Sequence, residues 1–167
     1  MAKLHRAKKL LFTSICEFLR LISRLRMATT VLNNGLSMPL VGLGTWKSQP
    51  GQVSASVYEA IRVGYRHIDA AWVYKNQDEV GEGINKAISE GLIKREDVWV
   101  TSKLWNDCHA TADVEASLKE TLSQLKLDYL DLFLIHWPVT TTDGAELTPP
   151  YSETWAAMES MVEKGLT

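Results

Sequence analysis

The sequence predicts an α/β fold built on a parallel sheet, in which a strand and a helix alternate four times. Short apolar segments bounded by turn residues are typical of buried parallel strands, and segments with helical periodicity lie between them. Polar residues near the ends of three strands recur at a regular spacing, because Lys103 follows Asp69 by 34 residues and His136 follows Lys103 by 33. One strand–helix unit per step suits right-handed crossovers in a parallel sheet.

Four segments have the composition of buried strands. They are residues 40–46 (LVGLGTW), 67–71 (HIDAA), 98–103 (VWVTSK) and 130–136 (LDLFLIH). Ahead of them, residues 30–40 contain the pair Asn34-Gly35, which favours a type I′ turn. We therefore expect a small antiparallel hairpin before the first parallel strand, placed to close one end of a barrel.

Four segments have the periodicity of amphipathic helices. The first two are residues 52–63 and 77–90, and the third repeats leucine or valine at Val114, Leu118, Leu122 and Leu125. The fourth follows Pro149-Pro150 and ends at Gly165. In this last helix we expect Ser152 to be the N-cap and the buried face to consist of Tyr151, Trp155, Met158 and Val162.

The chain length limits how these units can be arranged. A (β/α)8 barrel needs about 250 residues, whereas 167 residues supply four units. We expect a truncated product or an incomplete gene model, with an exposed edge strand through which the fragment self-associates. The alternative is a complete small doubly wound sheet of four units.

The first 26 residues differ in charge from the rest of the chain. They hold seven Lys or Arg and one acid, Glu17, so this segment carries +6 while the remainder carries −8. We divide the chain into a basic amphipathic extension, 1–26, and a folded part, 27–167. The extension is either an organelle-targeting or membrane-surface helix, or a leader upstream of an ordinary start at Met27.

Composition argues against several classes of function. The acidic body does not suggest nucleic-acid binding. Cys108, His109 and His136 lack the ligand spacing of a zinc site, and Gly42-Leu43-Gly44 is not a Rossmann fingerprint because Lys47 stands where the third glycine would be. The two cysteines show no pairing motif, which indicates a reducing compartment, the cytoplasm.

Asp69, Tyr74, Lys103 and His136, here called the polar quartet, are the candidate catalytic residues. An ammonium group near a tyrosine hydroxyl stabilises the phenolate, which makes Tyr74 a candidate general acid beside Lys103. Asp69 would hold Lys103 charged, and a neutral His136 could orient a carbonyl oxygen. Each residue also has a structural interpretation: Tyr74 caps a strand, Lys103 is solvated, Asp69 pairs with Arg66, and His136 packs in the core.

Several segments together resemble the aldo-keto reductase family, over residues 31–167. They are residues 64–71 (GYRHIDAA) followed by Tyr74, Asn76, Glu79, Val80 and Gly81, then residues 101–105 (TSKLW), 128–132 (DYLDL) and 136–138 (HWP). Residues 44–48 (GTWKS) and 50–53 (PGQV) are most similar to the aldose and aldehyde reductase branch.

The resemblance implies the N-terminal hairpin and first four βα units of a TIM barrel, and NADPH-dependent reduction of an aldehyde or ketone. It implies that Tyr74 is the proton donor, that Lys103 and Asp69 tune it, and that His136 orients the substrate. It places Gly44, Thr45, Trp46 and Asp69 against the nicotinamide half of the cofactor, and Trp46, Trp105, His136 and Trp137 around the substrate.

The resemblance also implies what the chain lacks. Later units of the family supply much of the cofactor site, so we expect the chain alone to be inactive, and the full-length enzyme to be a monomer without a metal. The alternative function is a non-catalytic NADPH-binding or interaction fragment that associates with a full-length relative. The substrate is not determined, because loops after the later strands normally select it.

Overall fold

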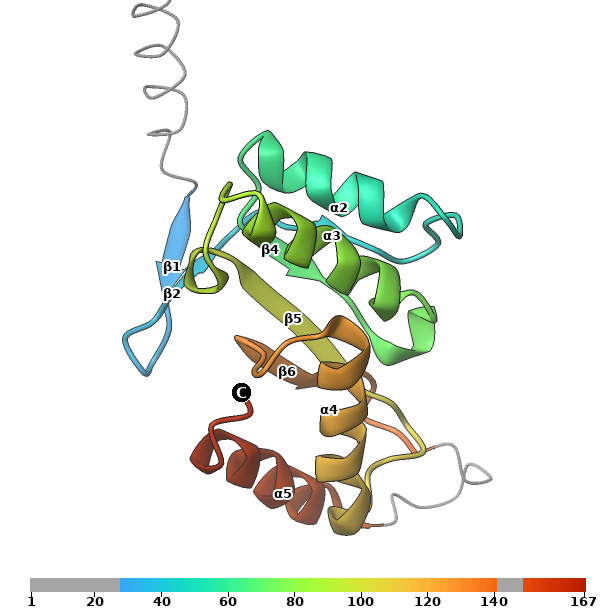
Figure 1. The fold of residues 1–167 in the computed structure, drawn as a ribbon. Helices are drawn as coiled ribbons and strands as arrows, with labels where there is room; N and C mark the ends of the chain where they lie inside the picture. The colour runs from blue at the N-terminus through green and yellow to red at the C-terminus, as the bar shows by residue number, and fades with distance from the viewer. Residues whose placement is uncertain (1–27, 141–148) are drawn as a thin grey trace, which may run out of the picture.

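A computed structural model describes residues 28–140 and 149–167. The expectations for residues 1–26 therefore lie outside the described residues. A two-stranded sheet comes first along the chain, and the four strands of a second sheet then alternate with helices (Figure 1). The elements are β1 (Thr29–Val31), β2 (Ser37–Pro39), β3 (Leu43–Gly44), α2 (Val53–Arg62), β4 (His67–Asp69), the 3-10 helix η1 (Trp72–Tyr74), α3 (Gln77–Ser89), the 3-10 helix η2 (Arg95–Asp97), β5 (Trp99–Leu104), α4 (Thr111–Leu125), β6 (Leu132–Ile135) and α5 (Tyr151–Glu163).

The main sheet has its four strands in the order of the sequence, β3-β4-β5-β6, and all of them are parallel. One α-helix lies between each strand and the next, with the 3-10 helices η1 and η2 on either side of α3, which confirms the predicted alternation. The doubly wound alternative is wrong, because such a sheet reverses its strand order at a switch point and this one does not. Strands β3, β4 and β6 are shorter than predicted, whereas β5 has the predicted six residues displaced by one position. Strand β3 pairs with β4 only through Leu43 and Gly44.

The two faces of the sheet have different surroundings. One face carries Ile68, Val100, Leu104 and Phe133, which belong to the buried core together with the helices. The helices contact one another in the order α2, α3, α4, α5. On the other face the partially exposed residues include Asp69 and Lys103, as well as Leu134, which is 39% exposed. Side chains alternate between faces along a strand, so the helices cover one set, while Asp69 and Lys103 lie on the opposite face.

Helix α3 packs closely against both of its neighbours, and two glycines allow this. A Cβ atom on Gly81 would lie 2.3 Å from the backbone oxygen of Leu125 at the end of α4. A Cβ atom on Gly83 would lie 2.5 Å from the backbone oxygen of Ser54 in α2. Both glycines are buried, so α3 fits between α2 and α4 only without side chains at these positions.

The N-terminal hairpin is present, but its turn is not the predicted type I′. That turn needs a positive φ at both central residues, whereas only Gly35, with φ +84°, has one; Asn34 does not. The Gly35 N–H donates to Leu32 O (2.9 Å), and the Asn34 side-chain oxygen accepts from the N–H of Leu36 (3.1 Å). The hairpin reaches the amino end of β4, because His67 Nδ1 lies 3.0 Å from Pro39 O. The predicted location of the hairpin is therefore consistent with the structure.

Helix α5 begins and faces differently from the prediction. Its N-cap is Pro150, so Ser152 lies within the first turn and does not cap it. The buried residues are Thr154, Ala157, Met158 and Met161, whereas Tyr151, Trp155 and Val162 are exposed. Thr154 can be buried because its hydroxyl donates to His109 O (2.8 Å). Among the described residues no helix combines the length and the apolar character that crossing a membrane requires.

Candidate active site

The carboxyl ends of the four parallel strands bring the predicted polar residues together. Thr45 directly follows β3, Asp69 is the last residue of β4, Lys103 is the penultimate residue of β5, and His136 directly follows β6. The His136 N–H donates to Leu104 O (3.0 Å), which continues the strand pairing by one more residue. Parallel strands end at the same edge of a sheet, so residues far apart in sequence meet there.

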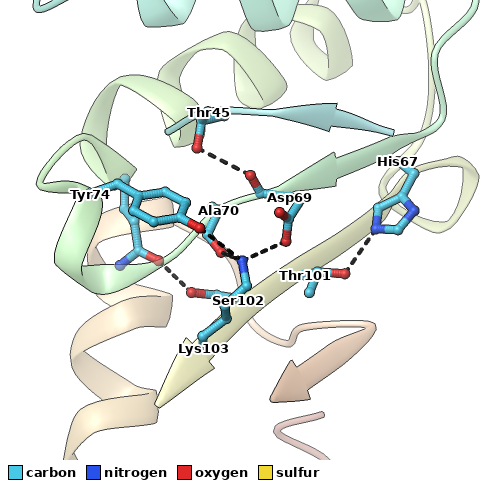
Figure 2. Close-up of polar contacts among 9 residues, drawn as sticks. Thr45, His67, Asp69, Ala70, Tyr74, Thr101, Ser102 and Lys103 are labelled. Atoms are coloured by element: carbon cyan, nitrogen blue, oxygen red, sulfur yellow. Dashed lines mark hydrogen bonds and ion pairs between the residues drawn. The ribbon is translucent and has the colours of Figure 1, made fainter. Parts of the chain in front are cut away.

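Lys103 is at the centre of the polar quartet (Figure 2). Its Nζ atom lies 2.7 Å from Asp69 Oδ1, 2.9 Å from Ala70 O and 3.4 Å from the Tyr74 hydroxyl. Only 13% of the Lys103 side chain is exposed, against 40% for Asp69. The ammonium has three protons to donate and three oxygen partners, so this part of the site is satisfied.

These contacts decide three of the structural interpretations. Lys103 is not a solvated surface lysine, since its ammonium is enclosed by Asp69 Oδ1, Ala70 O and the Tyr74 hydroxyl. Arg66 does not pair with Asp69, because its guanidinium donates to the backbone oxygens of Ile61 (2.9 Å) and Tyr65 (2.7 Å). The Tyr74 hydroxyl points to Lys103 and does not cap a strand.

His136 lies among aromatic rings beside this group. Its ring is edge-on to Tyr74 (5.8 Å between centroids) and to Trp105 (5.1 Å), and it stacks on Trp137 (6.1 Å). Burial lowers the pKa of His136, and the Lys103 charge lowers it further while Asp69 opposes this. His136 is therefore neutral at pH 7. Its Nδ1 atom is buried without a hydrogen-bond partner in the described part of the chain.

The three tryptophans expected around a substrate differ in exposure. Trp46 and Trp137 are 66% and 56% exposed, and Trp105 is partly buried. Trp46 lies 6.4 Å from Tyr74 between ring centroids, so aromatic rings approach Tyr74 and His136 from β3, β5 and β6. A fourth, Trp72, packs instead: its indole N–H donates to Glu120 Oε1 (2.9 Å).

The residues expected to touch a nicotinamide cofactor lie together at the ends of β3 and β4. Thr45 is 1% exposed, and its N–H and hydroxyl both donate to Asp69 O (3.1 and 3.2 Å). Apart from Gly44 and its two chain neighbours, no described residue has a heavy atom within 4 Å of the position that a Cβ on Gly44 would take. The open backbone at Gly44, the exposed Trp46 ring and the partly exposed Asp69 carboxylate fit a planar ring with polar substituents.

The structure also reveals residues that support the site and to which the sequence interpretation gave no role. Asn76 Nδ2 donates to Thr45 O (2.8 Å) and Gln77 contacts both β5 and α4. The Glu79 carboxylate accepts the N–H groups of Gly51 and Val53 at the start of α2. One signal was available for Gln77, since it occupies the core position of the periodic pattern Gln77, Val80, Ile84 and Ile88.

Residues 28–140 and 149–167 contain no cluster of three or more His, Cys, Asp or Glu residues suited to a metal ion. Cys108 is a free thiol, and burial together with the neighbouring Asp107 raises its pKa to about 11. Burial lowers the pKa of His109, so this imidazole is neutral at pH 7.

Comparison with known proteins gives consistent similarities. The model of the aldo/keto reductase family matches residues 40–167. A solved structure of a Bombyx mori aldo-keto reductase in complex with NADP superposes with a TM-score of 0.79 at 43% identity, covering 85% of this chain and 48% of that one. A Schistosoma japonicum aldose reductase gives a TM-score of 0.77 at 45% identity, covering 84% and 50%.

Curated relatives extend the same similarity. The D/L-glyceraldehyde reductase of Hypocrea jecorina is 58% identical over 123 residues, which are 72% of this chain and 37% of the relative. The aldo-keto reductase family 1 member A1 of Gallus gallus is 50% identical over 148 residues, which are 81% of this chain and 45% of the relative. The chain thus spans less than half the length of these two relatives.

Proposed function

Since the chain belongs to the aldo/keto reductase family, we propose that its polar quartet serves the NADPH-dependent reduction of an aldehyde or ketone to an alcohol. The resemblance predicted from the sequence is confirmed, and so is the fold, which is about the first half of a TIM barrel. The observation that carries the proposal is the Lys103 ammonium held between the Asp69 carboxylate and the Tyr74 hydroxyl.

In the proposed mechanism Tyr74 is the proton donor. The substrate carbonyl oxygen takes the proton of the Tyr74 hydroxyl, and the adjacent Lys103 ammonium stabilises the phenolate that remains. Asp69 keeps the ammonium aimed at Tyr74 through its 2.7 Å contact. NADPH, when bound, would supply the hydride for the carbonyl carbon.

His136 has a separate proposed role, which is to orient the substrate. A neutral imidazole can donate one hydrogen bond to a carbonyl oxygen without repelling Lys103, and the lowered pKa of His136 keeps it in that form. Trp46, Trp105 and Trp137 would provide an apolar surface for the rest of the substrate. The tryptophans and His136 therefore bind, whereas Tyr74 reacts.

We propose Gly44, Thr45, Trp46 and Asp69 as contacts to the nicotinamide half of NADPH. The support is their adjacency at the ends of β3 and β4, and the NADP bound in the Bombyx mori structure. Because the chain matches less than half of the length of its relatives, we expect the 167-residue chain alone to oxidise NADPH no faster than background.

We also propose a cytoplasmic location, which the free thiol of Cys108 supports.

A fusion tests the function. The part of the Gallus gallus relative that follows its matched segment is joined after Thr167, and NADPH oxidation is measured with glyceraldehyde. We expect an active fusion, and Tyr74→Phe should lower kcat by about 10²- to 10⁴-fold, the usual contribution of a general acid. Tyr58→Phe is the matched control, because it removes the hydroxyl of another partly buried tyrosine, which donates to Glu90 and lies outside the polar quartet. A Tyr74→Phe fusion with unchanged kcat would refute the proton-donor role.

One observation favours a second candidate function, an interaction fragment. Strand β6 is an edge of the described sheet, and Leu134 on it is exposed. An unpaired parallel edge beside apolar surface can pair with another chain, so the fragment would associate with a full-length relative. Mixing the purified chain with the Gallus gallus relative tests this: we expect a complex in size-exclusion chromatography, and two separate peaks would exclude the association.

A further inference from the structure

A series of side-chain hydrogen bonds runs from the buried Ser102 on β5, through the buried Gln77, to the partly buried Gln124 on α4, behind the polar quartet. The Ser102 hydroxyl donates to Gln77 Oε1 (2.6 Å), and Gln77 Nε2 donates to Gln124 Oε1 (2.8 Å). Ser102 and Gln77 are 0% and 1% exposed. Burying an amide and a hydroxyl in a core is costly even when they are paired, so packing alone does not account for this choice of residues.

A carboxylate fixes the direction of the hydrogen bonds. Glu120 Oε1 only accepts, and it receives the Gln124 side-chain N–H (3.0 Å) and the Trp72 indole N–H (2.9 Å). Gln124 must therefore present its oxygen to Gln77, whose own oxygen then faces Ser102. Ser102 is left with one arrangement, in which its hydroxyl donates to Gln77.

Both ends of this series of hydrogen bonds adjoin the reacting residues. Ser102 immediately precedes Lys103 on β5, and its side chain points to the helices while that of Lys103 points to Asp69. At the other end, Trp72 lies in η1, the same 3-10 helix as Tyr74. Gln77 begins α3, so the segment from Trp72 to Gln77 is held on either side of Tyr74.

We propose that Ser102 and Gln77 are positioning residues that set the separation between the Tyr74 hydroxyl and the Lys103 ammonium. Their catalytic meaning rests on the proposed function. That separation is 3.4 Å, whereas Lys103 lies 2.7 Å from Asp69, so the Tyr74 contact is the longer of the two and the more easily lost. A shift of the 71–77 segment by a few tenths of an ångström would break it.

The first test needs no activity. The ammonium signal of Lys103 is recorded by ¹⁵N NMR in the 167-residue chain, and assigned by its loss in Lys103→Met. Ser102→Ala and Gln77→Met remove the same hydrogen bond from its two ends, and each should speed exchange of the Lys103 ammonium protons by about tenfold. Ser102→Thr keeps the hydroxyl and should restore slow exchange.

Thr154→Val is the matched control, because it removes another buried hydroxyl with a 2.8 Å hydrogen bond, remote from Lys103 in α5. We expect it to lower the Tm while leaving the Lys103 signal unchanged. If Ser102→Ala and Gln77→Met also lower the Tm but leave the exchange of the Lys103 ammonium protons unchanged, the two residues are merely structural and the proposal is overturned.

The second test uses the fusion. Ser102→Ala should lower kcat about tenfold at constant KM, and should add nothing when Tyr74 is already Phe, because Ser102 acts through the Tyr74–Lys103 contact. An additive effect would contradict the proposal. A fusion that is inactive with every residue intact, while the Lys103 signal responds to Ser102→Ala, would count against the proposed function and support the positioning role.

Discussion

Gly81→Ala should destabilise the chain although alanine is the better helix former. An alanine Cβ would lie 2.3 Å from Leu125 O, 2.6 Å from Leu125 C and 2.8 Å from Leu125 Cα, and all three atoms are backbone. Cβ contacts essentially never fall below 3.0 Å, so α3 and the end of α4 must separate by at least 0.7 Å. A rotamer change cannot relieve the clash, because no side chain causes it.

The magnitude follows from two opposed terms. Replacing glycine by alanine inside a helix gains about 1 kcal/mol. Overpacking of a well-packed site costs about 1–3 kcal/mol and occasionally more, and backbone atoms place this site at the upper end. The separation also stretches the hydrogen bonds of Asn85 Nδ2 to Leu125 O (3.3 Å) and Lys126 O (3.4 Å), which join α3 to the end of α4. We expect a net loss of about 2 kcal/mol.

Urea unfolding followed by circular dichroism measures the free energy of unfolding of the variant and the parent chain. Glu82→Ala is the matched control, because Glu82 adjoins Gly81 in α3 but is exposed, and we expect a change of at most about 0.5 kcal/mol. A Gly81→Ala chain as stable as the parent would refute the reasoning, since it would show that α4 can retreat from α3 without cost.

Two further predictions concern charged groups. Glu79→Gln should destabilise the chain by about 1 kcal/mol, because Glu79 caps the N–H groups of Gly51 and Val53 at the positive end of α2, where Gln52 gives no side-chain cap. Thermal unfolding measures this loss, and Asp78→Asn is the control. Equal losses of stability in the two variants would contradict the capping role. Glu115 accepts from Lys119 and Lys164, which lower its pKa from 4.5 to about 2. The folded chain therefore binds this proton less readily than the unfolded chain, and the stabilisation present above pH 4.5 is lost as the pH falls toward 2. Urea unfolding at several pH values should show a smaller loss over this range in Glu115→Gln than in the parent chain, and identical pH profiles would show that the ion pairs contribute nothing.

The sequence was sufficient for the unit order and for the polar quartet, because both depend on spacing along the chain. A strand–helix unit has a nearly constant length, so Asp69, Lys103 and His136 had to arrive at the same edge of a parallel sheet. Tyr74 was assigned to the same site as a general acid beside Lys103 and from the family resemblance, and η1 does place its hydroxyl beside Lys103.

The errors arose where a tertiary contact outweighed a local preference. Hydrophobicity favoured Tyr151, Trp155 and Val162 as the buried face of α5, but the helix turns Thr154 inward because His109 O accepts its hydroxyl. Asn34-Gly35 favoured a type I′ turn, yet the Asn34 side chain bonds to the backbone of Leu36 and only Gly35 is left-handed. The partners of Gln77 and Glu79 could not be predicted, since they lie on other elements 25 to 47 residues away.

The sequential strand order also has a consequence for how the chain acquires its structure during synthesis. The strand pairs join residues separated by 25, 32 and 31 positions, as in Gly44 with Asp69, Asp69 with Thr101 and Thr101 with Leu132. Loop-closure entropy grows only with the logarithm of length, by about 0.6 kcal/mol per doubling, so each pairing has nearly the same entropic cost. Each strand can therefore join the sheet soon after it leaves the ribosome. Asp69, Tyr74 and Lys103 would meet once β5 has emerged, before His136 has left the ribosome.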